Sequence, residues 1–256
     1  NNKTSKRIKT KHGLFDVIVA LNVIPHTCNL NEVINSVSNL MKPDGHFIME
    51  GAYFFDTIYK GKFDTIYHEH VSSFTVTSIK NVLENFNLKL HYVDIISAQG
   101  GSIRIIAKKK TNSKQYLKIL KIEKKLLVDK ISTYKKVGEI INNKISEIKK
   151  NFEILSKVKK VIFLGAPARG VVIANVCNFD AKKIAYAIDD SKTKENKFFP
   201  GYSIRVKSWN QLKKNSNFNF LILSWNYNKE ILGKLGKLVK HYEVMLPLPK
   251  NKFIKR

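Results

Sequence analysis

The alternation of apolar and polar positions divides the first part of the chain into strands and helices. Residues 15–21 (Phe-Asp-Val-Ile-Val-Ala-Leu) form an almost continuous apolar run, which is typical of a strand buried in a parallel sheet. Apolar side chains at helical spacing predict a helix over 31–41, and a Pro-Asp-Gly sequence at 43–45 ends it. Residues 46–50 return as a strand. This strand–helix–strand unit predicts a parallel α/β sheet.

The pattern then changes from mixed to helical. A helix is expected near 77–85, and strands are expected at 88–96 and 102–108. From 113 to 157 the chain is rich in lysine, with apolar residues at three- and four-residue steps. This spacing indicates one or two amphipathic helices, which Gly138 is expected to weaken or interrupt. A coiled coil is the alternative, but the heptad is not sustained and the neighbouring charges are mostly of one sign.

The second half again alternates strands and helices, without repeating the sequence of the first. Strands are predicted at 161–164 and 184–188 with an apolar helix between them. Strands at 220–223 and 243–246 flank a further helix near 228–240. The chain is therefore expected to hold two α/β halves joined by the lysine-rich helical stretch.

Lysine dominates the charge of the chain. The sequence carries 46 Lys and Arg against 20 Asp and Glu, a net charge of +26, and residues 1–13 form a basic, polar stretch expected at the surface. Such an excess is a common footprint of nucleic-acid binding. Only five of the positive residues are Arg, which is preferred for bidentate contacts with phosphate and guanine. Because Lys accompanies abundant Asn and Ile, we favour the bias of AT-rich coding over specific nucleic-acid binding.

Cysteine content and hydropathy bear on the compartment. Cys28 and Cys177 are two lone thiols, which suit a reducing cytoplasm better than a disulfide framework and cannot form a four-cysteine zinc site. No apolar run approaches the ~20 residues of a membrane span, and the polar start lacks the apolar core of a signal peptide. We expect a cytoplasmic protein with no membrane association. The first residue is not Met, so we also expect the chain to be the tail of a longer protein.

Four titratable side chains stand side by side at Tyr67, His68, Glu69 and His70. Two imidazoles, a carboxylate and a phenol are the groups that proton transfer near neutral pH recruits. The alternative is a polar loop whose rings merely satisfy local hydrogen bonds, because such clusters indicate a site only statistically. On a strand the two imidazoles would share a face, and a metal there would need a third ligand from elsewhere. We predict no metal site.

Polar residues follow the predicted strands, where ligands bind in parallel α/β sheets. Asn22 and His26 follow the strand at 15–21, although Asn22 could equally cap a turn and His26 could pack on a helix end. Asn226 follows the strand at 220–223. These positions predict ligand contacts in both halves.

The segment Gly165-Ala166-Pro167-Ala168-Arg169-Gly170 lies between a predicted strand and a helix. Its small residues would let a phosphate approach backbone N–H groups at the helix N-terminus. The guanidinium of Arg169 would add two N–H donors to the same phosphate. The segment is not the full dinucleotide fingerprint, and close packing of strand against helix explains Gly165 and Gly170 nearly as well. Asp189, about twenty residues later at a strand end, stands where an acid meets a ribose hydroxyl.

Seven motifs occur in a fixed order along the chain. They are Phe-Asp-Val-Ile…Asn-Val-Ile-Pro-His, Lys-Pro-Asp-Gly…Glu, Phe-Asp-Thr-Ile-Tyr-His-Glu-His, Gly-Gly-Ser-Ile-Arg, Gly-Ala-Pro-Ala-Arg-Gly, Phe-Pro-Gly-Tyr-Ser-Ile and Trp-Asn. In this order the chain resembles the S-adenosylmethionine-dependent sugar C-methyltransferases, which branch deoxysugars in antibiotic pathways and have relatives in surface-polysaccharide clusters. The resemblance runs from about Phe15 to about Pro249.

The resemblance implies an α/β fold with three parts: a partial Rossmann-like methyltransferase sheet over 1–112, a helical linker over 113–157 and a second Rossmann-like domain over 158–256. The family also has a small N-terminal zinc-binding domain, a glycine-rich first motif for S-adenosylmethionine and an acidic residue for its ribose. The sequence holds none of these. Zinc is therefore expected only with a missing N-terminal domain.

The resemblance further implies methyl transfer from S-adenosylmethionine to a carbon α to a ketone of a nucleotide-linked deoxysugar. His70 would be the base, Tyr67 and Glu69 would position or polarise the substrate, and His26 would donate to the developing enolate oxygen. Asn22 would contact the cofactor. The nucleotide sugar would contact Gly165, Arg169, Gly170, Asp189 and Asn226. Two other functions stay open: a non-catalytic remnant or scaffold of a glycan-biosynthesis cluster and, less favoured, a basic nucleic-acid-binding protein.

Overall fold

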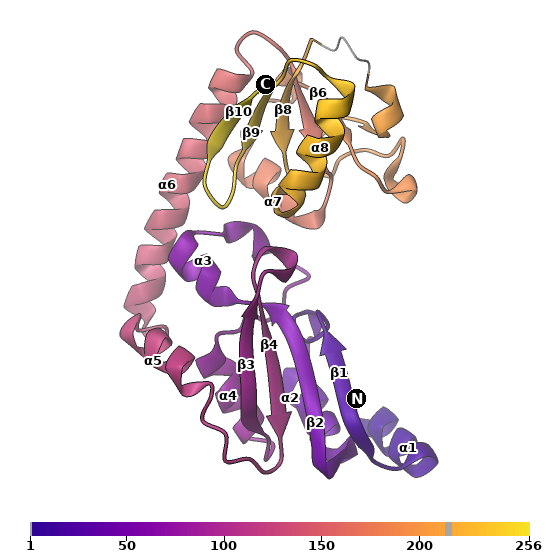
Figure 1. Cartoon of the computed structure of the whole chain (residues 1–256), viewed down its shortest axis with the longest axis vertical. Coiled ribbons are helices and arrows are strands. Elements are labelled where there is room, and N and C mark those ends of the chain that lie inside the picture. The colour runs from indigo at the N-terminus through magenta and orange to yellow at the C-terminus, as the bar shows by residue number, and fades with distance from the viewer. Residues whose placement is uncertain (1, 213–216) are drawn as a thin grey trace. The chain divides into compact units, whose positions relative to one another are not determined.

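The computed structural model describes residues 2–212 and 217–256, which form two compact units (Figure 1). The first unit runs to Tyr59 and resumes over His68–Val137, and the second consists of Lys60–Tyr67 and Gly138–Arg256. These units differ from the division expected at 112 and 157. The first helix of the expected linker, α5 (Leu117–Lys125), packs with the first unit against α4, and the short segment Lys60–Tyr67 packs with the second.

The first unit is built on a four-stranded sheet with the order β1-β2-β4-β3. β1 (Phe15–Leu21) pairs in parallel with β2 (Met41–Ala52), and α2 (Leu30–Leu40) connects them, which confirms the predicted strand–helix–strand unit. β4 (Ser102–Lys108) runs antiparallel to β2 and to β3 (Lys89–Ile96), so the sheet is mixed and the expectation of a parallel sheet holds for one pair only. The reason is the connection from β3 to β4, which is too short for a parallel crossover.

The two faces of this sheet differ in their cover. Helices α2 and α4 (Val76–Glu84) lie behind one face in Figure 1 and share a core with the strands. On the other face Val17, Val19 and Leu21 are 49%, 55% and 51% exposed. Within the described ranges β1 pairs on one side only, so the first sheet has an open edge there. Parallel strands are usually covered on both faces, which makes this apolar surface unusual.

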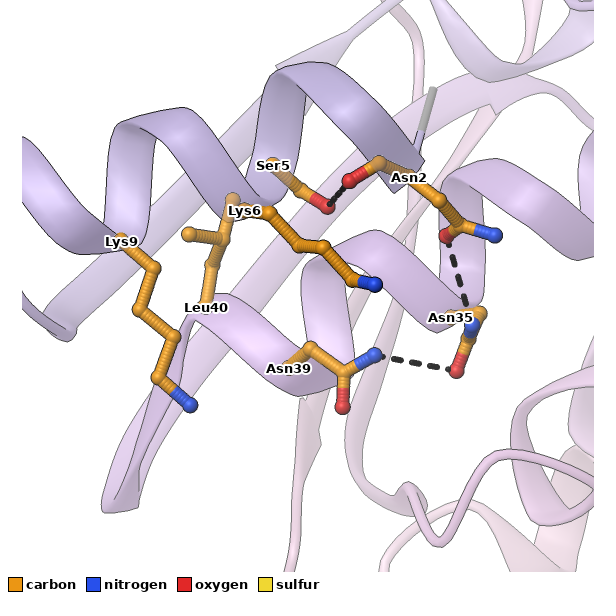
Figure 2. Close-up of a pocket in the computed structure, with 7 residues that line it drawn as sticks. All are labelled: Asn2, Ser5, Lys6, Lys9, Asn35, Asn39 and Leu40. Carbon is orange, nitrogen blue, oxygen red and sulfur yellow. Dashed lines mark hydrogen bonds between the residues drawn. The ribbon is translucent and has the colours of Figure 1, made fainter.

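Residues Asn2–His12 form a helix, α1, where a basic surface segment was expected. Figure 2 shows α1 lying along α2, where Asn35 Nδ2 donates to Asn2 Oδ1 at 3.4 Å. A cavity of about 460 Å³ separates the two helices and is lined mostly by Asn and Lys side chains. The pattern missed this helix because its contacts with α2 are polar, and polar contacts leave no apolar periodicity.

The Pro-Asp-Gly sequence at 43–45 forms a bulge within β2 instead of a turn before it. Phe15 pairs with Met41 and Val17 pairs with His46, so β2 carries extra residues between two registers. A Cβ on Gly45 would lie 3.0 Å from the carbonyl oxygen of Phe15. Glycine therefore allows the two strands to approach at this bulge.

The expected helical stretch contains two helices, and the expected break at Gly138 is wrong. α5 ends at Lys125, and α6 (Ile131–Leu155) runs through Gly138 without interruption. The break lies between them, where Leu127 adopts a φ of +51°. A glycine costs a helix about 1 kcal/mol, which the packing of a 25-residue helix overcomes. No helix within residues 2–212 and 217–256 is long and apolar enough to cross a membrane.

The second unit holds a six-stranded sheet with the order β10-β9-β8-β5-β6-β7. All neighbours are parallel except β9 and β10, which confirms a Rossmann-like arrangement. The pattern did not predict β7 and β10, which are short and carry lysine. The elements are β5 (Val161–Leu164), α7 (Ala168–Cys177), β6 (Ile184–Ile188), β7 (Val206–Lys207), β8 (Asn219–Ile222), α8 (Asn228–Leu238), β9 (Glu243–Leu246) and β10 (Lys252–Lys255).

Candidate active site

Two imidazole rings meet in the first unit beyond the carboxyl end of β1. His26 ends the 3-10 turn Ile24–His26, and its ring centroid lies 4.9 Å from that of His70 with an interplanar angle of 66°. The backbone N–H of Ser72 donates to the carbonyl of Pro25 at 3.1 Å and holds the loop of His70 against this turn. His26 is exposed and His70 is half-buried. The structure thus brings together two histidines that are 44 residues apart in the sequence.

The other members of the predicted cluster lie in the same loop, with different surroundings. His68 and Glu69 are exposed, while Tyr67 is half-buried. Tyr67 is the last residue of the segment that packs with the second unit, and His68 is the first to rejoin the first unit. The roles of Tyr67 and Glu69 stay predictions. Among the described residues, no group of three or more His, Cys, Asp or Glu side chains is arranged to hold a metal ion.

Asn22 follows β1 directly and adopts a left-handed conformation with φ of +53°. Its backbone N–H donates to the carbonyl of Glu50 at 2.8 Å, which fixes the first residue beyond the strand. Asparagine tolerates the left-handed conformation better than most residues, so the turn alone explains why an asparagine occurs at this position. Its side chain remains the predicted contact for the cofactor.

An ion pair beside Asn22 was not predicted. The guanidinium of Arg104 donates to Glu50 Oε2 through Nε at 3.1 Å and Nη2 at 2.9 Å, and the Glu50 side chain is 9% exposed. The strand register places Leu21 opposite Glu50 and Glu50 opposite Arg104. The ion pair fixes the position of a carboxylate near the carboxyl end of β2, at the edge of the candidate site. The sequence offered one indication of this ion pair, because Arg104 is one of few arginines in a lysine-rich chain.

In the second unit both glycines of the Gly-Ala-Pro-Ala-Arg-Gly segment lie against protein. Gly165 has a φ of +93°, and a Cβ there would lie 1.9 Å from Ser224 Oγ. A Cβ on Gly170 would lie 2.8 Å from Leu223 Cβ. The geometry favours close packing between α7 and the end of β8 as the reason for both residues.

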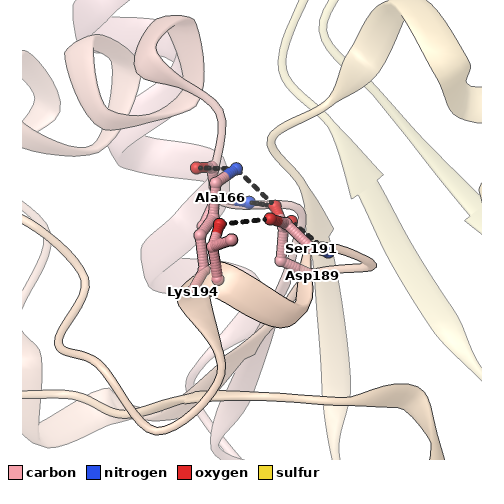
Figure 3. A network of polar contacts seen from close by, with 5 residues as sticks. Ala166, Asp189, Ser191 and Lys194 are labelled. Carbon is pink, nitrogen blue, oxygen red and sulfur yellow. Dashed lines mark hydrogen bonds and ion pairs between the residues drawn. The ribbon is translucent and has the colours of Figure 1, made fainter.

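Asp189 lies at the centre of a polar network beside this segment (Figure 3). Its Oδ2 accepts from the backbone N–H of Ala166 at 2.7 Å and from Lys194 Nζ at 3.1 Å, and its Oδ1 accepts from the backbone N–H of Ser191 at 2.9 Å. The carboxylate therefore takes a backbone N–H that a phosphate was expected to contact. Lys194 also donates to the carbonyl of Ala166 at 3.0 Å, which closes the network.

A cavity of about 310 Å³ adjoins this network within the second unit. Gly165 and Asp189 line it, together with the aromatic rings of Trp209 and Tyr227. Lys234 also lines it and forms an exposed ion pair with Asp190 at 2.7 Å. Of the predicted substrate contacts, Gly165 and Asp189 thus share one cavity, whereas Arg169, Gly170 and Asn226 are not among its lining residues.

Two Rossmann-like units, the first with a histidine pair beyond a strand end, define a two-part α/β protein. Residues 97–249 match the family of the C-methyltransferase C-terminal domain, and the chain belongs to that family. Residues 2–93 match a methyltransferase domain. The chain is 26% identical to the C-methyltransferase NovU of Streptomyces niveus over 260 residues, which cover 98% of this chain and 61% of NovU. It thus spans about three-fifths of the length of that relative.

A similarity to a solved structure is much weaker. The magnesium protoporphyrin IX methyltransferase ChlM from Synechocystis PCC 6803, solved with bound SAH, matches 37% of this chain and 44% of its own, with 15% identity and a TM-score of 0.30. This similarity is too limited to bear on fold or function.

Proposed function

We propose that the chain provides the base and part of the substrate site of an S-adenosylmethionine-dependent C-methyltransferase that acts on a nucleotide-linked deoxysugar. The observation that carries this proposal is the His26–His70 pair beyond the carboxyl end of β1 in a chain of this family. The similarity to NovU, a C-methyltransferase, supports it.

The chemistry begins with a proton. A carbon α to a ketone becomes a nucleophile only after it loses a proton, and His70 accepts that proton while the electron pair moves to the ketone oxygen. His26, in its protonated form, donates to the oxygen and stabilises the enolate. Ring centroids 4.9 Å apart allow the two imidazoles to reach neighbouring atoms of one substrate. S-adenosylmethionine, when bound, supplies the electrophilic methyl group that this carbon takes up.

Neighbouring residues have supporting roles in this proposal. Glu69, next to His70 in the exposed loop, and Tyr67 orient or polarise the substrate ketone. In the second unit the cavity beside Asp189 takes a polar part of the nucleotide sugar, with Gly165 at its wall and Trp209 as an aromatic face. Gly170, which packs against Leu223, together with Arg169 and Asn226, supports the framework of this site.

The residues present fit S-adenosylmethionine only in part. Asn22 and the Glu50–Arg104 pair lie at the carboxyl ends of β1 and β2 and supply polar contacts for one portion of the cofactor. The segment after β1 has no glycine-rich loop, and within the described ranges the other edge of β1 bears no strand. The chain alone therefore supplies the base more completely than it supplies the cofactor site.

Deuterium exchange separates the proton step from methyl transfer. We expect the chain, incubated in D₂O with a ketone-bearing nucleotide sugar, to exchange the proton on the α-carbon, as followed by ¹H NMR. His70→Ala should slow this exchange by about 10²–10⁴-fold, the usual contribution of a general base. His91→Ala is the matched control, because His91 pairs with Thr111 in the same unit and has no proposed role. Equal rates for the two variants would refute the role of His70, and no exchange by the wild type would favour a non-catalytic scaffold.

A further inference from the structure

The segment Lys60–Tyr67 packs with the second unit, although both of its neighbours in sequence belong to the first. Its 3-10 turn, Phe63–Thr65, lies against α7, and the side chain of Phe63 is buried in the core of the second unit. The chain leaves this unit between Tyr67 and His68, directly before the histidine motif. What holds the segment therefore also limits where that motif begins.

A buried carboxylate makes the principal contact. Asp64 is fully buried, and its Oδ2 accepts from Arg169 through Nε and Nη2, each at 2.8 Å. The indole Nε1 of Trp225 donates to the same oxygen at 2.7 Å. The Arg169 guanidinium also lies over the Trp225 ring at 4.9 Å. One side chain of the segment is thus bonded to α7 and to the turn that follows β8.

A second contact holds the start of the segment. Lys144 on α6 donates from Nζ to the carbonyl of Lys60 at 2.7 Å and to the carbonyl of Pro249 at 2.9 Å. Gly61, with φ of +60°, turns the chain beside Ile140 and Lys144. Burial lowers the pKa of the Lys144 ammonium and the charge of Lys62 lowers it further, whereas the carboxylates of Glu147 and Asp64 act in the opposite direction. The segment is therefore held at its start and at its middle.

The geometry gives Arg169 a role other than phosphate binding. Its Nε and Nη2 both contact one oxygen, Oδ2, of a carboxylate of the same unit, so the guanidinium is committed to that carboxylate. An ion pair whose carboxylate is fully buried, as that of Asp64 is, gains little stability over apolar packing of the same volume. Such pairs are well suited to fixing one arrangement of the chain, and here the fixed element is the segment before the histidines.

We infer that Asp64, Arg169 and Trp225 form a positioning anchor for the segment that precedes the histidine motif, and that this anchor restrains one end of the loop that carries His70. His70 lies six residues after Asp64, within a loop that has no regular secondary structure. Restraining one end of so short a loop restricts the conformations of the whole loop, and a displacement of about 1 Å at a reacting group can cost about 10²-fold in rate. This inference rests on the proposed role of His70 as the base.

Two variants test the anchor while keeping its volume. Asp64→Asn removes the charge, and Arg169→Lys keeps the charge but removes the fork. Glu243→Gln is the control, because it removes one carboxylate from a partly exposed ion pair with Lys255 on the same unit. We expect both anchor variants, and not the control, to speed amide hydrogen exchange over residues 65–70 by at least tenfold and to shift the NMR resonances of the His70 ring.

The rings of His46 and His91 serve as internal references in the first unit, with centroids 6.4 Å apart. Their unchanged resonances would show that the fold is intact, and Arg169→Lys remains informative where Asp64→Asn does not fold. The inference would be wrong if, in both variants, residues 65–70 exchanged their amide hydrogens at the wild-type rate and the resonances of the His70 ring did not shift.

Kinetics of α-proton exchange separates the anchor from substrate binding. A positioning role predicts that Arg169→Lys lowers kcat for exchange about 10- to 100-fold with little change in KM. A raised KM with unchanged kcat would instead show that Arg169 binds the substrate, and the inference would be wrong. A failure of His70→Ala to affect exchange would remove the base role, whereas the NMR result on the anchor would stand.

Discussion

Asp189 and Arg169 illustrate, at the scale of single residues, how a motif identifies side chains without identifying their partners. The strand-end position of Asp189 suggested a ribose contact, yet its oxygens accept hydrogen bonds from Ala166, Ser191 and Lys194. Arg169 suggested a phosphate contact, yet its guanidinium is bonded to Asp64. Asp189 joins the turn that follows it to Ala166, whereas Arg169 joins α7 to a segment 105 residues earlier in the chain.

The two thiols are expected to differ in reactivity. Cys28 is exposed, whereas Cys177 is buried, and burial raises the pKa of its thiol to about 12. Because the thiolate is the nucleophile, we expect iodoacetamide at pH 8 to alkylate Cys28 and leave Cys177 intact. Intact-mass spectrometry should show one adduct on the native chain and two in denaturant. Two adducts at similar rates under native conditions would contradict the burial of Cys177.

At the scale of elements, a buried carboxylate joins two helices of the first unit. Glu123 on α5 accepts from the backbone N–H groups of Val76 and Thr77 at the N-terminus of α4, each at 2.7 Å. The hydroxyl of Tyr53 donates to it at 2.8 Å, and burial together with this carboxylate raises the pKa of Tyr53. A negative charge is favoured at a helix N-terminus. This contact explains why a lysine-rich helix packs with the first unit instead of serving as a free linker.

Removing that carboxylate should destabilise the first unit. Glu123→Ala leaves buried donors of α4 without an acceptor, and we expect the free energy of unfolding to fall by about 3 kcal/mol. Urea denaturation measures the change. Glu139→Ala, which removes an exposed carboxylate from α6, is the control and should change it by less than about 0.5 kcal/mol. Similar losses for both variants would show that Glu123 does not cap α4.

At the scale of the whole molecule, the open edge and exposed face of the first sheet bear on cofactor binding. Val17, Val19 and Leu21 line an uncovered face, and beyond β1 no strand pairs within the described ranges. The proposed cofactor contacts, Asn22 and the Glu50–Arg104 pair, lie at the carboxyl ends of β1 and β2. We therefore expect a cofactor bound at the first unit to be contacted on one of its sides only.

We expect the 256-residue chain to bind S-adenosylmethionine weakly or not at all. Few contacts leave a ligand of this size with little free energy to offset its lost freedom of motion. Isothermal titration calorimetry measures the affinity, and the Asn22→Ala variant tests the one predicted contact. A micromolar Kd for the wild type would show that the cofactor site lies elsewhere in the chain.

Charge gives a second expectation for the whole molecule. With a net charge of +26, the chain should associate with DNA at low salt through release of counterions. Because arginines are few, we expect retention on a DNA column to disappear by about physiological salt and to show no sequence preference. A titration of salt against bound fraction checks this. Tight, sequence-selective binding at that salt would overturn the enzyme proposal.

The sequence by itself determined the elements whose apolar pattern is strong. Phe15–Leu21 and Val161–Leu164 are strands, and their continuous apolar runs predicted both with the observed bounds. Only the second run is buried along its whole length, so the pattern did not determine how well each strand is covered. The histidine motif was predicted from its four adjacent titratable side chains, and His26 was predicted from its place after a strand end. Apolar runs and clusters of titratable residues involve neighbours in the sequence, so they can be recognised without knowing the tertiary structure.

Only the tertiary structure decided what depends on distant partners. The polar helix α1 is supported by contacts with α2, and the place of β4 between β2 and β3 is set by pairing with a strand 50 residues earlier in the chain. The segment Lys60–Tyr67 packs with the second unit because Asp64 meets Arg169, 105 residues further along the chain. A buried charge is stable only beside its partner, and no periodicity in the sequence reveals which partner that is.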